Sequence, residues 1–308
     1  MRIRRFLMGS LLMAAAVLPC WGPSASAEAL STTEQRMLEA EQAVENGKSD
    51  VAVRIYSELL AKDPDNAEIL ASRGSIYCEA GLLDEAERDL GRALATAADA
   101  LHPNYYMGLV KLQKGDFRGA KSFLEKALFL AKDGEERSAA EDALGQVAFR
   151  EQDYGAAERH FTASIEGKES YAAYFHRAAA RMKKDDDSGA EADFSRLIEL
   201  YPERMEPYHQ RGICRGRMGN YNAALEDLAK AIEMEPGNAS IYNDRGYTYA
   251  CKKEFAAAVE DYTKAVTLDP KFQLAYANRI AAYEKLGKTD LAKNDRYLLE
   301  QLMEFDGE

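Results

Sequence analysis

Few residues in this sequence have the types and spacing that catalysis or metal binding requires. The 308 residues include four histidines, His102, His160, His176 and His209. No two of them are close enough along the chain to form the short pair that binds zinc on one face of a helix. His176, His209 and Cys214 could approach one another on adjacent helices, but their spacing matches no established metal site. We therefore predict no metal and no other cofactor.

Other patterns that carry chemistry are incomplete. Asp185, Asp186 and Asp187 precede Gly189, as at the start of a calcium-binding loop, but the later glutamate of such a loop is missing. No glycine-rich phosphate-binding loop follows a predicted strand. No serine has a histidine and a carboxylate placed to activate it as a nucleophile. The sequence therefore predicts that the protein is not an enzyme.

The overall charge argues against two further classes of partner. The chain has a formal net charge of −12 and a pI near 5.1. A general nucleic-acid-binding protein needs a basic surface that displaces counterions from phosphate, and anionic membranes also attract basic segments. We therefore expect neither a nucleic acid nor a membrane surface as the partner.

The first 27 residues have the pattern of a secretory signal peptide. Arg2–Arg5 is a basic start, residues 6–18 are apolar, and Ala25–Ala27 has the small residues of a cleavage site. The apolar run is too short to span a membrane comfortably. We expect residues 1–27 to be cleaved off near Ala27, and residues 28–308 to be exported to a bacterial periplasm without a membrane span.

The cysteines raise two alternatives. Lipid anchoring at Cys20 is disfavoured, because Pro19 stands where a lipoprotein signal has a small residue. An exported protein meets an oxidising compartment, so Cys214 and Cys251 could form a disulfide if their Cα atoms lie within about 7 Å. The sequence leaves this pairing open, and reduced thiols are the simpler expectation.

One pattern recurs along the rest of the chain with a period of about 34 residues. It is clearest in the segments Tyr208–Cys214, Asn243–Tyr249 and Tyr276–Tyr283. The pattern resembles that of the tetratricopeptide repeat family, whose unit is a pair of antiparallel helices. We place eight repeats at residues 33–66, 67–100, 101–137, 138–170, 171–204, 205–238, 239–272 and 273–306.

Small residues mark where the two helices of a repeat should cross. Because small side chains let two helices approach closely, the resemblance implies one such residue near the middle of each first helix. In the last repeat Ile280 departs from this rule. The positions on the first helix are Gly74, Gly108, Gly145, Ala178, Gly212 and Gly246. The matching positions on the second helix are Ala52, Ala86, Ala120, Ala157, Ala190, Ala224, Ala258 and Ala292.

The resemblance implies an all-α fold, a right-handed superhelical solenoid in which each helix pair covers the apolar face of its neighbour. Proline after several second helices supports this reading, because proline cannot continue a helix. Glycines at residues 47, 81, 115 and 219 should form the turn between the two helices of a repeat. Lys288, Lys293, Asn294 and Arg296 on the last helix predict a solvated cap.

Five repeats share a pair of opposite charges that the family pattern does not require. Each has an arginine at its seventh position and an aspartate sixteen residues later, whereas the other three repeats have neither. Because the two positions change together, we predict a direct ion pair between the two helices of each of these repeats. The pairs are Arg73 with Asp89, Arg177 with Asp193, Arg211 with Asp227, Arg245 with Asp261, and Arg279 with Asp295.

The resemblance also implies where a partner would bind. In this family the first helices line a concave groove, and aromatic residues flanked by polar ones suit a peptide. A lysine and asparagine clamp for a C-terminal carboxylate is not supported, because Glu206, Ser240 and Leu274 occupy its basic positions. The candidate contacts are Tyr105, Tyr106, Leu109, Phe149, Arg150, Phe175, His176, His209, Asn243, Tyr247 and Asn278.

These observations favour a non-catalytic scaffold or adaptor of the bacterial cell envelope that binds a protein or peptide in the concave groove. Two alternatives stay open, namely a structural solenoid that associates with itself and a regulatory subunit of an envelope enzyme complex. Repeat folds host many functions, so the sequence does not identify the partner.

Overall fold

The computed structural model describes residues 31–305, so the predicted signal peptide and Cys20 lie outside the described residues. Within this range the chain forms sixteen α-helices and no strand, which confirms the expected all-α repeat array. The described helices divide into two compact units, one ending at residue 169 and one beginning at residue 170. Each unit contains four helix pairs.

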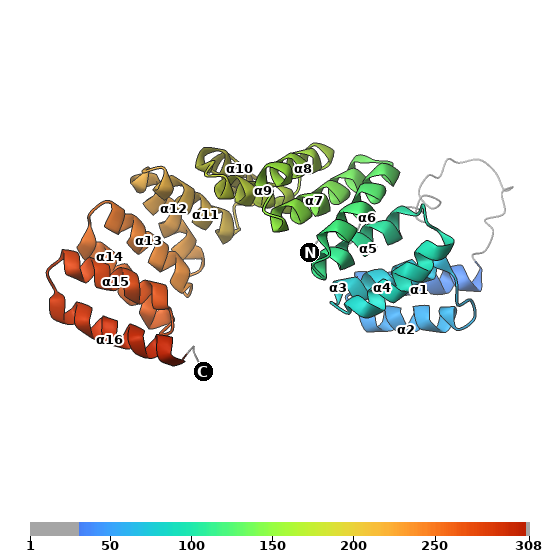
Figure 1. Ribbon diagram of the computed structural model, residues 1–308, viewed down its shortest axis with the longest axis horizontal. Coiled ribbons are helices and arrows are strands. Elements are labelled where there is room, and N and C mark those ends of the chain that lie inside the picture. Colours follow the sequence, from blue (N-terminus) through green and yellow to red (C-terminus); the bar gives the residue numbers. More distant parts are fainter. Residues whose placement is uncertain (1–30, 306–308) are drawn as a thin grey trace, which may run out of the picture. The chain divides into compact units, whose positions relative to one another are not determined.

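In the N-terminal unit each helix packs against the next along the chain (Figure 1). Ser31 begins the first helix with a reciprocal cap, because its hydroxyl accepts a hydrogen bond from the Glu34 N–H and the Glu34 carboxylate accepts one from the Ser31 N–H. The helices are α1 (Thr32–Glu45), α2 (Ser49–Leu60), α3 (Ala67–Glu79), α4 (Leu83–Thr96), α5 (Leu101–Gln113), α6 (Phe117–Leu130), α7 (Gly134–Arg150) and α8 (Tyr154–Gly167).

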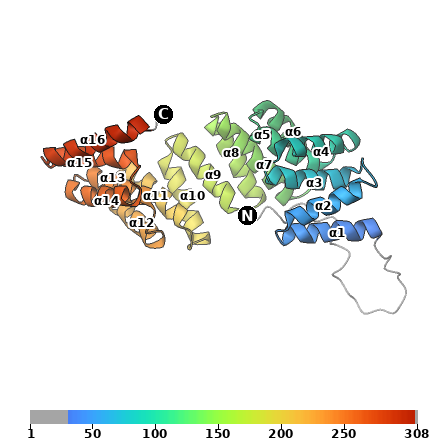
Figure 2. The same ribbon diagram turned by 90° about the horizontal axis from the view of Figure 1, so that it is seen from below.

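The C-terminal unit repeats the same arrangement, which can be followed from two directions (Figures 1 and 2). Its first helices are α9, α11, α13 and α15, and its second helices are α10, α12, α14 and α16. The bounds are α9 (Tyr171–Lys183), α10 (Asp187–Leu200), α11 (Met205–Arg217), α12 (Tyr221–Met234), α13 (Ala239–Cys251), α14 (Phe255–Leu268), α15 (Gln273–Lys285) and α16 (Thr289–Phe305).

The turn inside each repeat needs one residue in the left-handed region. Gly219 takes this place with φ of 82°, as the sequence suggested. Gln152, Asp185 and Lys253 take it in three other repeats with φ between 59° and 66°, although they carry a side chain. The turn is therefore imposed by the packing of the two helices and does not depend on glycine in every repeat.

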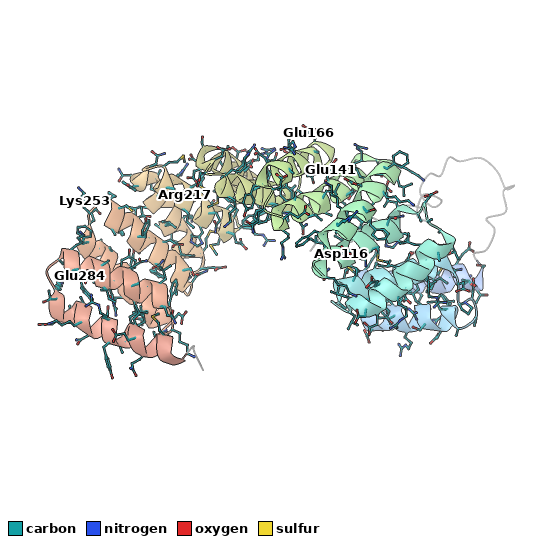
Figure 3. The ribbon with its side chains drawn as sticks, in the orientation of Figure 1. Asp116, Glu141, Glu166, Arg217, Lys253 and Glu284 are labelled. Carbon is teal, nitrogen blue, oxygen red and sulfur yellow. The ribbon has the colours of Figure 1, made fainter. Side chains whose placement is uncertain are left out.

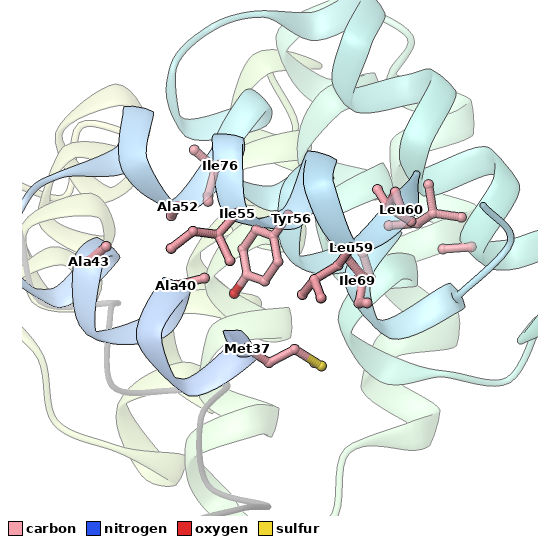
Figure 4. Packing of buried hydrophobic residues seen from close by; sticks show 13 residues of the cluster. Met37, Ala40, Ala43, Ala52, Ile55, Tyr56, Leu59, Leu60, Ile69 and Ile76 are labelled. Carbon is pink, nitrogen blue, oxygen red and sulfur yellow. The ribbon is translucent and has the colours of Figure 1, made fainter. Parts of the chain in front are cut away.

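Apolar side chains fill the space between the helices of each unit. In the N-terminal unit, Met37 and Ala40 of α1 lie against Ile55, Tyr56 and other residues of neighbouring helices (Figure 4). Burial of this kind supplies the main stabilising term, because no single helix pair can cover its own apolar face.

In five repeats the glycine of the first helix faces a large side chain of the second helix, and in three of them it also lies close to the backbone of the expected alanine. A Cβ atom added at Gly246 would lie 2.8 Å from the Tyr262 ring and 3.2 Å from the carbonyl oxygen of Ala258. The backbone of Ala258 therefore lies close to Gly246, and the side chain of Tyr262, four residues after Ala258, fills the space beside the glycine. The same contact joins Gly74 to Leu90, Gly108 to Leu124, Gly145 to Phe161, and Gly212 to Leu228.

The last repeat departs from this arrangement. Ile280 is buried on the first helix, and the residue sixteen positions later is Arg296. Arg296 is exposed and bonds Glu284 at 2.7 Å, so it is not a large apolar filler. In this repeat the large apolar side chain therefore stands on the first helix, whereas in the earlier repeats it stands on the second. The predicted polar cap is only part of the picture, because α16 also exposes Leu291, Tyr297, Leu298 and Met303.

None of the helices in the described range is both long enough and apolar enough to cross a membrane.

Candidate functional site

The structure brings each predicted arginine and aspartate together. In every pair Nε and Nη2 of the arginine donate to the two carboxylate oxygens at 2.6 to 3.0 Å, which is the bidentate geometry that this pair of side chains favours. All five aspartates are buried. The five pairs therefore bind the first helix of a repeat to its second helix from inside.

Three of these arginines also reach the preceding repeat, a contact that sequence reasoning missed. Nη1 of Arg73 donates to the Ser57 hydroxyl at 2.9 Å, and Nη1 of Arg211 donates to Ser195 at 3.1 Å. Arg279 bonds Thr263 in the same way at 3.1 Å. The signal was present as a hydroxyl residue sixteen positions before the arginine. Each of these arginines thus links three helices.

Two of the aspartates accept a second arginine. Arg215 donates to Asp227 at 2.8 Å and to Glu191 of the preceding repeat at 2.7 Å. Arg181 donates to Asp193 at 2.9 Å. The second arginine stands four residues after the first, which is one helical turn. These charges hold the helices of the two repeats in position.

Further ion pairs lie at the turns of the C-terminal unit, where Figure 3 labels Arg217 and Glu284. Arg217 bonds Asp185 at 2.6 Å and Asp187 at 3.2 Å, so the acidic run is paired with an arginine of the next repeat. Among the described residues no group of three or more histidine, cysteine, aspartate or glutamate side chains could hold a metal ion.

The described cysteines are free thiols, so Cys214 and Cys251 are not joined in this structure. Cys78 and Cys214 are buried, and burial raises the pKa of each thiol to about 12. Both are therefore protonated and unreactive at neutral pH.

The predicted contacts Tyr105 and Tyr106 are corrected by the structure, because both rings are buried in the core of the N-terminal unit. They meet edge to face at 5.3 Å between ring centroids. Burial raises the pKa of both phenols well above the usual value. Leu109 is partly buried against the same core. These residues hold the unit together and do not present an open aromatic surface.

The other two predicted contacts of the N-terminal unit are Phe149 and Arg150. Phe149 is partly buried, with its ring edge-on to Tyr154 at 5.3 Å, whereas Arg150 is exposed. Phe175 and His176 of the C-terminal unit are also partly buried, and Phe175 stacks on Tyr171 at 5.8 Å. The rings of Phe149, Phe175 and His176 are therefore only partly exposed.

A polar network joins the first helices α11, α13 and α15. His209 Nε2 lies 2.7 Å from a carboxylate oxygen of Asp244, and the Asn243 amide donates to the other oxygen at 3.2 Å. The Asn278 amide in turn donates to the side-chain oxygen of Asn243 at 2.9 Å. Asn243 is buried, which corrects its place among the predicted contacts, because its side chain serves these internal hydrogen bonds.

Beside this network lies an exposed apolar strip. Tyr247 of α13 is 58% exposed and Leu274 of α15 is 55% exposed. Ala277 and Ala281 are also exposed, and their spacing places them on the same side of α15 as Leu274. We call Tyr247, Leu274, Ala277 and Ala281, with the neighbouring Asp244, the first-helix face of the C-terminal unit. Sequence reasoning found Tyr247 but did not select Leu274 as a contact.

Electrostatics on this face centre on Asp244 and Tyr247. The electrostatic effect of the neighbouring Cys251 thiol raises the pKa of Tyr247 above its usual value. The phenol therefore stays neutral at physiological pH. The face combines an uncharged ring, an aliphatic strip and one partly exposed carboxylate that His209 orients.

Comparison with solved structures shows the same fold. The chain is similar to YrrB, described as a TPR protein with an unusual peptide-binding site, with a TM-score of 0.53 and 23% identity over 60% of this chain and 95% of YrrB. It is also similar to a tetratricopeptide repeat protein from Parabacteroides merdae, with a TM-score of 0.55 and 21% identity over 81% of this chain and 98% of that protein. PilW, described as a widely conserved type IV pilus biogenesis factor, is similar with a TM-score of 0.61 and 18% identity over 68% of this chain and 96% of PilW.

Sequence comparison gives the family. No curated protein matches the chain. Sequence models described as tetratricopeptide repeat match residues 37–103, 143–204, 206–238 and 239–272, which together make up more than half of the chain. These matches cover helices in both units, and the helix pairs there have the geometry described above. The chain therefore belongs to the tetratricopeptide repeat family.

Proposed function

We propose that the protein is a non-catalytic scaffold that binds a peptide or protein segment on the first-helix face of the C-terminal unit. The observation that carries this proposal is the exposure of Tyr247 and Leu274 beside a fixed polar network. Large apolar side chains gain most by being covered, and the neighbouring Asp244 can accept hydrogen bonds from a bound backbone.

The rigidity of the face supports the same conclusion. His209 and Asn243 hold Asp244 in one orientation, and Arg245 beside it is fixed by Asp261. A surface whose polar groups are already ordered loses little conformational entropy on binding. YrrB, of similar fold, is described as having a peptide-binding site, and members of this family are typically scaffolds.

We also propose that the protein works in the cell envelope after export. The support is the basic, apolar and small-residue pattern of residues 1–27, which is typical of a secretory signal peptide. PilW, another protein of similar fold, is described as a pilus biogenesis factor, which fits an envelope setting. Mass spectrometry of the protein from its host should give a first residue of Glu28. A full-length chain in the cytoplasm would overturn export.

Photo-crosslinking in the host would test the binding surface. A photoreactive phenylalanine analogue at position 247 should capture a defined partner segment. The matched control places the same analogue at Phe129 of the N-terminal unit, which is 88% exposed. Equal capture of one partner at both positions, or no capture at position 247, would contradict the proposal.

A further inference from the structure

One side of the first helices in the N-terminal unit is strongly acidic. These helices are α1, α3, α5 and α7 (Figure 1). Positions two, five, six, nine, twelve and thirteen of a repeat share one side of its first helix, because they recur at helical spacing. In the four N-terminal repeats they hold six acidic residues, among them the capping Glu34, and one basic residue, Arg150. In the four C-terminal repeats they hold three of each, with histidine counted as neutral. The excess of negative charge therefore belongs to the N-terminal unit and is not a general consequence of composition.

Five of these carboxylates form a surface that we call the acidic face. It consists of Glu41 and Glu45 of α1, Glu68 and Glu79 of α3, and Asp142 of α7. None of its four glutamates forms an ion pair with another described residue. Partial burial raises the pKa of Glu41, and the charges of Glu68 and Glu45 raise it further. Like charges of α1 and α3 therefore lie close together without a cation between them.

A buried hydroxyl group is directed toward the same surface. Tyr105 of α5 is 6% exposed, and its hydroxyl has no hydrogen-bond partner among the described residues. Burial raises the pKa of this phenol, with further contributions from Asp142, Cys78 and Glu79, so the hydroxyl lies near two carboxylates of the acidic face. It is not sealed off from the surface, in contrast to the hydroxyl of Tyr171. Because a buried polar group is normally satisfied, the Tyr105 hydroxyl is available to a donor from outside the chain.

The acidic face has two ends, one at each end of α3. Glu68 and Glu79 are eleven residues apart, which is three helical turns and about 16 Å. Glu41 lies close to Glu68 at one end. At the other end Asp142 and Glu79 lie close to the Tyr105 hydroxyl. An extended chain advances about 3.3 Å per residue, so two basic side chains five residues apart would reach both ends.

The sign and the extent of the acidic face select among ligands. Its carboxylates are spread over three helices, and no group of described residues could hold a metal ion. Nucleic acids and anionic membranes carry the same sign of charge and would be repelled. A single exposed ion pair contributes at most about 1 kcal/mol, so a ligand must form several. An extended polypeptide with spaced basic residues meets these requirements.

We propose that the acidic face binds an extended basic segment of a partner protein, in which arginine or lysine residues about five positions apart pair with its two ends. At the end near α7, a guanidinium can donate both to a carboxylate and to the Tyr105 hydroxyl, because arginine has five donors. This site goes beyond the proposed binding at Tyr247 and Leu274 and does not rest on it.

Fluorescence anisotropy with the chain beginning at Glu28, which contains every described helix, tests the proposal. The probe is a labelled ten-residue glycine and serine peptide that carries two pairs of arginines, placed five positions apart. At about 50 mM salt it should bind at least about tenfold more tightly than the same peptide with glutamine in place of arginine. Salt at about 300 mM should weaken binding about tenfold, because exposed charges are then screened.

Matched double variants locate the binding surface. Glu68→Gln combined with Glu79→Gln should weaken binding at least about fivefold, because each end of the face loses a charge. The control combines Glu85→Gln with Glu125→Gln, which removes the same charge from the second helices α4 and α6 of the same unit. This control should bind within about twofold of the wild-type chain.

Tyr105→Phe separates a contact with the ligand from a role in folding. It should weaken binding about threefold without lowering stability to urea, because the hydroxyl has no described partner to lose. Tyr247→Ala combined with Leu274→Ala should bind the arginine peptide normally, so failure of one surface is told apart from failure of the other. Equal binding of the arginine and glutamine peptides, equal loss in the two glutamine double variants, or unchanged binding by Tyr105→Phe would overturn the proposal.

Discussion

The buried arginine and aspartate pairs act at the scale of single residues. Arg245 and Asp261 form the simplest pair, because no third charged side chain is bonded to either of them in the described contacts. The bond to Asp261 raises the pKa of Arg245 above its usual value, as expected for a well-formed pair. At Asp227 a second arginine complicates the measurement, since removal of one guanidinium leaves another in place.

A double-mutant cycle at Arg245 and Asp261 should show strong coupling. Asp261→Leu leaves a half-buried guanidinium unpaired and should lower the free energy of unfolding by about 2 kcal/mol. The double variant Arg245→Met with Asp261→Leu should cost less than the sum of the two single changes, with a coupling of about 1 kcal/mol or more. Urea unfolding followed by circular dichroism measures all four proteins.

The control for this cycle is the exposed pair of Lys230 and Glu233, whose nitrogen and oxygen lie 3.0 Å apart. Its coupling should be at most about 0.5 kcal/mol, because water screens the two charges. Equal coupling in the buried and exposed pairs would contradict a structural role for the buried ones.

His102 should make stability depend on pH. Burial lowers its pKa to about 4, from the ordinary value of 6.5. Between these values the unfolded chain binds a proton that the folded chain does not, so stability falls as the pH drops from 6.5 toward 4 and is unaffected above 6.5. Because the residue is only partly buried, the loss between pH 7 and pH 5 should be about 1 kcal/mol.

The variant His102→Gln isolates this contribution. Urea unfolding at pH 7 and pH 5 should show a smaller loss of stability in the variant than in the wild-type chain. The same loss in both proteins would mean that His102 is protonated in the folded state.

At the scale of helices, the fit between a small residue and a large one sets the distance between the two helices of a repeat. Ala178 with Phe194 stands where Gly246 and Tyr262 stand two repeats later, so a methyl group can be accommodated by a small adjustment. A branched side chain cannot, because the facing ring and backbone are already in contact.

Gly246→Val should therefore destabilise the C-terminal unit by about 2–3 kcal/mol, through overpacking against Tyr262 and Ala258. The matched control is Gly237→Val, since a Cβ atom at Gly237 would meet nothing within 4 Å. Urea unfolding compares the two variants. If both lose the same stability, the helix spacing is not set by this contact.

Much of this level could be predicted from the sequence. The helix pairs are predictable from the period of 34 residues, the small residues and the prolines, because each repeat must place the same contacts at the same positions. The Arg and Asp pairs were visible because both residues change together. Their serine and threonine partners were overlooked, since a hydroxyl group is common on any helix surface.

The candidate site was less predictable. The family positions identify which residues lie on the first helices, but not how far the neighbouring helix covers them. Tyr105 and Tyr106 of α5 pack into the core of the N-terminal unit, whereas Tyr247 of α13 is exposed. All three are predicted groove positions on first helices. The sequence predicts Asn243 as a polar contact, but Asn278 and Asp244 satisfy both ends of its amide. Burial of this kind depends on packing between repeats.

At the scale of the molecule, the two compact units each have apolar clusters of their own. A fragment of residues 170–308 should therefore fold alone, because the contacts within a repeat array are between neighbours. It should show the circular dichroism of an α-helical protein and a cooperative urea transition. A fragment that lacks helical structure would mean that the unit depends on the preceding repeats.

Peptide binding on the first-helix face of the C-terminal unit can be measured directly. A peptide selected by phage display on the chain beginning at Glu28 gives the probe, and isothermal titration calorimetry measures its dissociation constant. Tyr247→Ala combined with Leu274→Ala should weaken binding at least about thirtyfold, or about 2 kcal/mol. The control Phe129→Ala, which removes a more exposed ring in the N-terminal unit, should leave it unchanged. Unaltered binding by the double variant, or loss with Phe129→Ala alone, would contradict the account.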